Sequence, residues 1–196
     1  MTFRSLGFFA SSGARAKPGM VLLTPTSIAH SGTSASIGAN GQVTFTAVTS
    51  LSLNGVFSAT YDNYVIAYQA VSSTNTNFDI RFRVSGSDNS TANSYVVERL
   101  DATSTTVEAA RTTSNIANLS SIGSSGRSGG TVALYGPFLT QPTAFRTVTP
   151  YNENGNAYLI DAAGTHNQST SYDGFTLTTT SPRTITGTLT VYGIRS

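Results

Sequence analysis

The fold is decided by the stretch Phe78–Val84, which reads FDIRFRV. Four apolar side chains alternate with one acid and two arginines, so a β-strand gathers all the apolar groups on one face. In a helix, the same residues would distribute those apolar side chains around the whole helix axis. The stretch therefore predicts a strand with one buried face, and the turn-forming run Gly86–Ser90 ends it.

The same period of two recurs along the chain from Gln42 onward. Turn signals interrupt it at intervals of about 8–12 residues, which is typical of a β-sandwich or barrel. Asn154-Gly155 is the clearest hairpin turn, and 106–111 and 116–122 are the weaker strand candidates. We expect roughly nine or ten strands after residue 42, with no helix beyond a possible single turn in Leu53–Thr60.

This pattern predicts an all-β, antiparallel β-sandwich that is jelly-roll-like. We assign residues 21–196 to the sandwich and residues 1–20 to a short extended N-terminal arm. Pro25 limits 21–28 to an edge strand at best, and the run His30–Gly41 is expected to be a loop. Threonine and serine are expected to coat the outer faces of the strands.

Composition narrows the class of protein. The 196 residues suffice for one domain, and the absence of cysteine excludes disulfides and thiolate chemistry. Charged residues make up 10%, well below the usual level of about 25%, whereas serine and threonine number about 58. Such a surface can pack against copies of itself without burying unpaired charge, which favours an assembled particle or oligomer.

The charge distribution argues against a nucleic-acid partner, and the short apolar runs argue against a membrane. The net charge is +2, and the arginines are scattered singly except for Arg81 and Arg83, so we expect no nucleic-acid binding. No run approaches the length of about 18 apolar residues that a membrane span needs, so we expect no membrane insertion.

Candidate catalytic groups are few. His166 lies near Asp161 and Asp173, but the chain has no Gly-x-Ser-x-Gly elbow and no paired-carboxylate signature. His30 lies in a Ser/Gly run far from any acid. We therefore predict a protein that is not an enzyme and has no cofactor and no metal site; a small cell-wall polysaccharide hydrolase using Asp161, His166 or Asp173 is the less favoured alternative.

The motif Tyr61–Tyr64, reading YDNY, allows two interpretations. Its Asp and Asn can form an Asx turn that starts a strand, with both tyrosines packed inside the sandwich. Alternatively, exposed tyrosine rings with neighbouring polar groups form a sugar-binding platform. The candidate glycan contacts are Tyr61, Asp62, Asn63, His166, Asn167, Tyr172 and Asp173.

Several motifs together resemble a recurring domain of tailed-bacteriophage virion proteins, of the minor-tail or tail-fibre-end type found especially in phages of actinobacteria. They are Ser52–Tyr64 (SLNGVFSATYDNY), Phe82–Ala92 (FRVSGSDNSTA), Tyr135–Pro137 (YGP), Gly164–Ser169 (GTHNQS) and Tyr172–Phe175 (YDGF). The resemblance runs from about Pro18 to the C-terminus. It implies a β-sandwich, location in the virion after synthesis in the host cytoplasm, and a homotrimer; it supplies no catalytic residues.

The N-terminal arm carries aromatic and cationic residues without any acid, which suits docking on a larger acidic assembly. The anchoring candidates are Phe3, Arg4, Leu6, Phe8, Phe9, Arg15 and Lys17. The leading expectation is thus a virion structural protein, attached by this arm to other tail or capsid proteins, whose sandwich contacts a host cell-surface carbohydrate. A capsid decoration or head-fibre protein without a ligand is the alternative.

Overall fold

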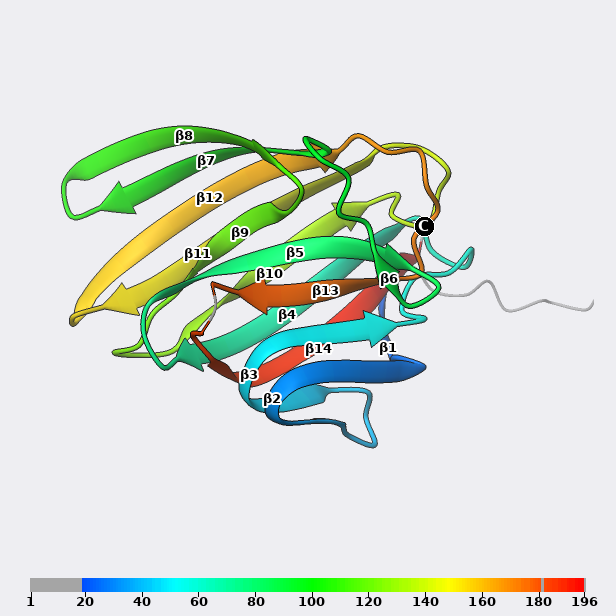
Figure 1. The fold of residues 1–196 in the computed structure, drawn as a ribbon, viewed down its shortest axis with the longest axis horizontal. Helices are drawn as coiled ribbons and strands as arrows, with labels where there is room; N and C mark the ends of the chain where they lie inside the picture. Colours follow the sequence, from blue (N-terminus) through cyan, green and yellow to red (C-terminus); the bar gives the residue numbers. More distant parts are fainter. Residues whose placement is uncertain (1–18, 181, 196) are drawn as a thin grey trace, which may run out of the picture.

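The computed structural model describes residues 19–180 and 182–195, and that part of the chain is all β (Figure 1). Strands make up 68% of it and it contains no helix, which confirms the expected class and leaves no helix that could cross a membrane. The strands are β1 (Gly19–Leu23), β2 (Ser27–Ile37), β3 (Val43–Asn54), β4 (Asn63–Ser72), β5 (Thr76–Val84), β6 (Ser87–Asp88), β7 (Tyr95–Thr103), β8 (Thr106–Ser114), β9 (Ala117–Ile122), β10 (Ser128–Tyr135), β11 (Thr143–Glu153), β12 (Asn156–His166), β13 (Gly174–Thr179) and β14 (Ile185–Arg195).

These strands form one continuous antiparallel sheet that curls over on itself into two layers. The larger layer follows the order β8-β7-β12-β11-β10-β4-β14, and β1 pairs with β14. The smaller layer contains β13 and β5, with β6 and β9 also paired to β5. Strand β9 contacts β11 and β12 without pairing with either, so the smaller layer lies across the larger one, as Figure 1 shows.

Strand β3 belongs to both layers. Its first half pairs with β14 and its second half pairs with β13. Between the two halves, Ala47 adopts a φ of 46° and donates its N–H to Oγ1 of Thr186 (2.9 Å). The registers of β2 and β14 against β3 shift at the same level, beside Gly32 and Gly187. This row of bulges bends β3 from one layer into the other.

The core fills the space between the layers. Phe78, Ile80 and Phe82 of β5 are fully buried, as the alternation predicts, and the inward residues of β4 and β14 meet them from the larger layer. The fourth apolar residue, Val84 at the end of the strand, is exposed instead. In β14 the predicted face of Ile185, Gly187, Leu189 and Val191 is also buried. Burying each large apolar side chain contributes about 1.5–3 kcal/mol, so this interior is the main source of stability.

The N-terminal part of the sandwich differs from expectation. The run His30–Gly41 is not a loop, because β2 extends from Ser27 to Ile37 and pairs with β3 along most of that length. Small polar residues give no periodic signal, and backbone pairing with β3 decides the conformation instead. Residues 55–60 form no helical turn, and twelve strands, β3 to β14, follow residue 42.

Strand β11 reverses the expected orientation of threonine. Thr143, Thr147 and Thr149 point into the core and are at most 1% exposed, whereas Val148 and Pro150 point outward. The hydroxyls of Thr147 and Thr149 lie 3.2 Å apart, and the hydroxyl of Tyr68 lies 2.8 Å from Oγ1 of Thr149 and 3.0 Å from Oγ of Ser120. Oγ1 of Thr143 is buried without a hydrogen-bond partner. Threonine therefore coats only part of the outer surface.

Candidate functional site

Four connecting loops, 55–62, 85–94, 136–142 and 167–173, meet at one end of the sandwich. Backbone hydrogen bonds join them: Gly136 N–H donates to Asp62 C=O (2.8 Å) and Asn167 N–H donates to Ser94 C=O (2.9 Å). Loops held in this way on a rigid scaffold are the usual place for binding residues. We refer to this region as the loop end.

Asp173 links three segments of the loop end. Its carbonyl accepts the N–H groups of Val56 and Phe57 (3.0 and 3.1 Å), and its carboxylate Oδ2 accepts the N–H of Ser85 (3.0 Å). The other carboxylate oxygen, Oδ1, is buried without a hydrogen-bond partner. The backbone and side chain of Asp173 thus connect segment 167–173 to segments 55–62 and 85–94.

A buried aromatic cluster lies directly beneath these loops. His166, Tyr95 and Tyr172 have no exposed surface, and the imidazole stacks on the ring of Tyr95 with a centroid separation of 4.0 Å. Burial lowers the pKa of His166 to about 4, opposed only weakly by the backbone of Ser94, because Nδ1 makes no hydrogen bond of normal geometry. The imidazole is therefore neutral at physiological pH.

The candidate glycan contacts fall into two groups. Asp62 and Asn167 are exposed at the loop end, and Asn63 and Asp173 are partly exposed. Tyr61, His166 and Tyr172 are buried, and the ring of Tyr61 packs edge-on against Tyr64. Their rings do not present a face to solvent, so only the four polar residues are placed where they could touch a sugar.

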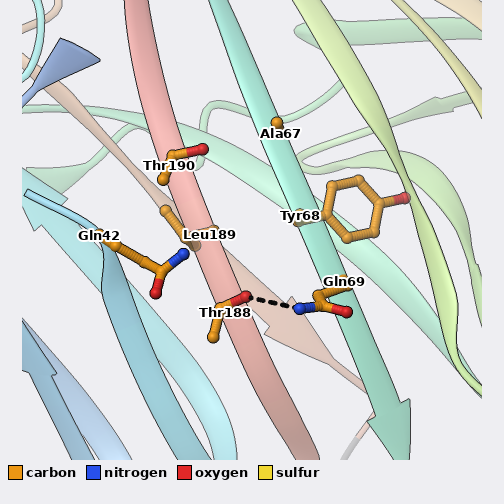
Figure 2. Close-up of a pocket in the computed structure, with 7 residues that line it drawn as sticks. All are labelled: Gln42, Ala67, Tyr68, Gln69, Thr188, Leu189 and Thr190. Carbon is orange, nitrogen blue, oxygen red and sulfur yellow. Dashed lines mark hydrogen bonds between the residues drawn. The ribbon is translucent and has the colours of Figure 1, made fainter.

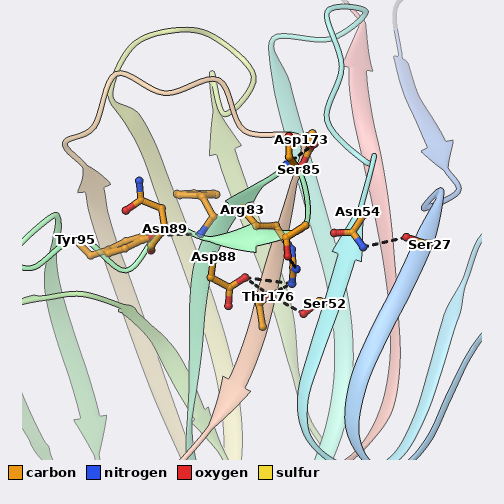
Figure 3. A network of polar contacts seen from close by, with 12 residues as sticks. Ser27, Ser52, Asn54, Arg83, Ser85, Asp88, Asn89, Tyr95, Asp173 and Thr176 are labelled. Carbon is orange, nitrogen blue, oxygen red and sulfur yellow. Dashed lines mark hydrogen bonds and ion pairs between the residues drawn. The ribbon is translucent and has the colours of Figure 1, made fainter.

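A buried ionic network joins β5, β6, β13 and β3 (Figure 3). Nη1 of Arg83 is 3.2 Å from Oδ1 of Asp88 and donates to Oγ1 of Thr176 (2.6 Å). Thr176 in turn donates to Asp88 (2.6 Å) and lies 2.8 Å from Oγ of Ser52. Arg83 also donates to the carbonyl of Gly86 and is only 8% exposed.

Sequence alternation alone places Arg83 on a solvated face, and this expectation is wrong. The two-residue turn after β5 folds β6 back onto it, so Asp88 pairs directly with Arg83. Ser85 and Gly86 occupy that turn with φ values of 51° and 79°. An arginine and an acid on either side of a Ser-Gly turn is the signal that could have identified the pair.

A second ionic network joins the two layers at their edge. Asn118 of β9 donates to Oδ1 of Asp79 (2.6 Å) and accepts a hydrogen bond from Arg99 of β7. Arg99 also forms a two-pronged ion pair with Asp101 (2.5 and 2.7 Å). Burial raises the pKa of Asp79 to about 6, although the amide of Asn118 and the charges of Arg81 and Arg99 act in the opposite direction.

The outer face of the larger layer exposes large apolar side chains. Leu100, Val107, Val148 and Leu159 are 41–67% exposed and lie on four successive strands, β8, β7, β12 and β11. Cross-strand pairing places Val107 opposite Ala102 and Leu159 opposite both Ala102 and Pro150. We refer to these four side chains as the outer patch.

Charged pairs border the outer patch on the same face. Arg146 forms an ion pair with Asp161 (2.9 Å), which raises the pKa of Arg146, and Arg111 forms an ion pair with Glu98. A shallow groove between them is lined by Leu100, Ala109 and Ala163. A contiguous apolar area with a polar border is typical of a protein contact surface.

The opposite part of this face is polar. Between β4 and β14, a second shallow groove beside Gln42 is lined by Ala67, Gln69 and Thr190, and Nε2 of Gln69 donates to Oγ1 of Thr188 at 3.3 Å (Figure 2). The apolar character therefore belongs to the β8–β11 half. Sequence analysis missed the outer patch, although Leu159 beside the buried Ile160 and Val148 between two threonines were available as signals.

Within residues 19–180 and 182–195, no three histidine or carboxylate side chains gather closely enough to hold a metal ion. The anchoring candidates Phe3, Arg4, Leu6, Phe8, Phe9, Arg15 and Lys17 lie outside the described residues, and β1 begins at Gly19.

In comparisons with known proteins, no family model and no curated protein sequence matches the chain.

Proposed function

We propose that this chain is a structural protein of a tailed-bacteriophage particle, a minor tail or tail-fibre component. In this proposal the arm, residues 1–17, attaches it to other virion proteins and the sandwich faces outward, with copies assembling around a threefold axis. The motifs that resemble phage tail domains supply the identity of the assembly. The outer patch is the structural observation that supports a role in an assembly.

The physical reason is the free energy of exposed apolar surface. Full burial of a leucine or valine contributes about 1.5–3 kcal/mol, and the half-exposed side chains of the outer patch forgo part of that contribution. Leu100, Val107 and Leu159 lie close enough together to be covered by one partner surface, and the ion pairs beside them are satisfied within the chain. Covering the patch strands no charge, so another virion protein can dock there at low electrostatic cost.

The loop end supports the attachment part of the proposal. Asp62 and Asn167 expose a carboxylate and an amide, which are the groups that hydrogen-bond sugar hydroxyls, and the hydrogen-bonded loops fix their positions. We propose that this end contacts a carbohydrate on the host surface. Because the nearby tyrosine rings are buried, recognition relies on hydrogen bonds instead of ring stacking.

The particle assignment is tested by following a tagged chain during infection. The full chain should co-purify with phage particles on a density gradient, whereas a variant lacking residues 1–17 should stay soluble and folded but be absent from them. Loss of the full chain from purified particles would contradict the assignment itself. Particles that still carry the truncated chain would contradict only the role of the arm.

Attachment is tested by binding of the purified full chain to host cell-wall glycans. Replacing Asp62 or Asn167 with alanine should weaken binding about tenfold for each lost hydrogen bond. Asn156→Ala, at the opposite end of the sandwich, is the matched control and should bind normally. If the wild-type chain shows no binding to any host glycan, the decoration role without a ligand takes the place of attachment.

A further inference from the structure

Strand β8 is an unprotected edge of the larger layer. It pairs only with β7, and eight of its nine residues, Thr106 to Thr113, are exposed. The backbone groups on its outer side therefore have no strand partner within the described residues. Natural proteins usually protect such an edge, since it is a ready template for another strand.

Most of the usual protective features of an edge strand are missing from β8. Its sequence, TVEAARTTS, contains no proline, glycine or lysine, and its pairing with β7 runs without a bulge from Thr106 to Ser114. Its two charges, Glu108 and Arg111, cancel. A long, regular and neutral edge of this kind favours addition of another strand.

We propose that β8 pairs antiparallel with β8 of a second copy of this chain about a two-fold axis, which joins the two larger layers into one sheet. The reason for choosing a second copy is that the strand is complementary to itself. In such a pairing, residues that face each other lie on the same side of the sheet. This geometry decides which registers are electrostatically allowed.

Two central registers keep like charges apart. With Ala109 on the axis, Glu108 faces Ala110 and Arg111 faces Val107 of the second copy. With Ala110 on the axis, Glu108 faces Thr112 and Arg111 faces Ala109. Moving the pairing one step further in either direction places Glu108 opposite Glu108, or Arg111 opposite Arg111, which is destabilising. The allowed registers therefore both place an alanine on the axis.

The contact also extends the outer patch. Val107 and Ala109 lie on the same face as Leu100 of β7. Because a two-fold axis perpendicular to the sheet keeps this face on the same side, the two outer patches become neighbours. The pairing occupies the free edge of both β8 strands, so the association stops at two copies and does not grow into a fibre. This contact does not require the particle assignment and differs from a threefold association.

The test is the mass of the purified full chain by sedimentation over a range of concentrations. The wild type should form a dimer, or a species with an even number of copies. Ala109→Lys should raise the dissociation constant about tenfold or more, because the new lysine faces another lysine in one register and Arg111 in the other. Ala157→Lys, an exposed alanine of β12, is the matched control and should associate like the wild type.

Ala110→Lys then distinguishes the registers. It weakens association if Ala110 lies on the axis and strengthens it if Ala109 does, because the lysine then faces Glu108. Amide hydrogen exchange of residues 106–114 should slow with rising concentration in the wild type. A wild type that stays monomeric, a wild type that forms only trimers, or an Ala109→Lys variant that folds and associates like the wild type would overturn the proposal. None of these three results bears on the particle experiment.

Discussion

Nε2 of His166 lies 2.6 Å from the hydroxyl of Tyr172, and both side chains are fully buried. The direction of this hydrogen bond follows from Asn89, whose Oδ1 accepts the N–H of Thr91 (3.0 Å) and whose amide therefore donates to the same hydroxyl (2.9 Å). Tyr172 consequently donates its proton to Nε2, and protonation of the imidazole would break this arrangement.

Replacing His166 with glutamine should remove a loss of stability at acidic pH. The folded pKa of about 4 lies below the ordinary 6.5, so the unfolded chain binds the extra proton. The contribution of the neutral His166 side chain to the free energy of unfolding is fully present above pH 6.5. It decreases as the pH falls toward 4, and the total loss is at most about 3 kcal/mol. The free energy of unfolding, measured by urea from pH 7 to 4, should fall less in His166→Gln than in the wild type. Parallel curves for the two proteins would contradict the shifted pKa.

Replacing Asp79 with asparagine should have the opposite pH dependence. The folded pKa of about 6 lies above the ordinary 3.8, so the folded chain holds the proton more tightly and loses stability as the pH rises from 3.8 through 6. Asp79→Asn should therefore gain up to about 3 kcal/mol relative to the wild type at pH 7, and nothing at pH 4. The same urea titration measures it, and a variant less stable at pH 7 than at pH 4 relative to wild type would contradict the assignment.

The two groups overlap between pH 4 and 6 with opposite signs. In the wild type their contributions largely cancel, so a flat stability profile there is expected even though each group is strongly perturbed. The double variant His166→Gln/Asp79→Asn is the control. Its profile should again resemble that of the wild type in slope.

Gly32→Ala should destabilise the fold by at least about 2 kcal/mol. Gly32 has a φ of 121°, and an added Cβ would lie 2.2 Å from the carbonyl oxygen of Ala47, at the bulge that bends β3. Gly155→Ala separates the two causes, because Gly155 has a φ of 79° with open space around it. Thermal unfolding should show a much smaller decrease for Gly155→Ala, and equal decreases would mean that contact with Ala47 plays no part.

Arg83→Ala should lower the free energy of unfolding by about 3 kcal/mol, since it removes the cation that pairs with Asp88 and the donor to Oγ1 of Thr176. Asp88→Ala should cost at least as much, because it leaves the guanidinium of Arg83, which is only 8% exposed, without its counter-charge. The double variant should be less destabilised than the sum of the two by about 1–2 kcal/mol, because both changes remove one interaction. Additive losses in a double-mutant cycle would show that Arg83 and Asp88 act independently.

The sequence predicts the fold well wherever one face of a strand is buried and the other is solvated. Phe78–Phe82 of β5 and Ile185–Val191 of β14 satisfy that condition, and both bury the predicted face. The end of β5 departs from it, because Arg83 is buried and Val84 is exposed. It fails for β2, where Ser, Gly and Ala residues carry no alternation and pairing with β3 determines the structure. It also fails at Thr147–Thr149, because threonine is compatible with a buried hydroxyl network as well as with water.

The candidate site was less predictable. Asp62 and Asn167 are exposed, but the burial of Tyr61 depends on residues far away in sequence, such as Gly193, against which its ring packs. Likewise, Val107 and Leu159 are 52 positions apart in the sequence and become parts of one surface only through the strand order β8-β7-β12. No local pattern contains that order, so the outer patch could be found only in three dimensions.

The sharing of β3 and β14 between neighbours has a consequence for biosynthesis. Strand β14 pairs with β4, β3 and β1, so it completes the hydrogen bonding of strands made much earlier on the ribosome. Until residues 185–195 have emerged, those strands keep open edges and the two layers cannot be joined correctly. Folding of the nascent sandwich must therefore wait until β14 has been made, and premature termination before β14 yields a product prone to aggregate.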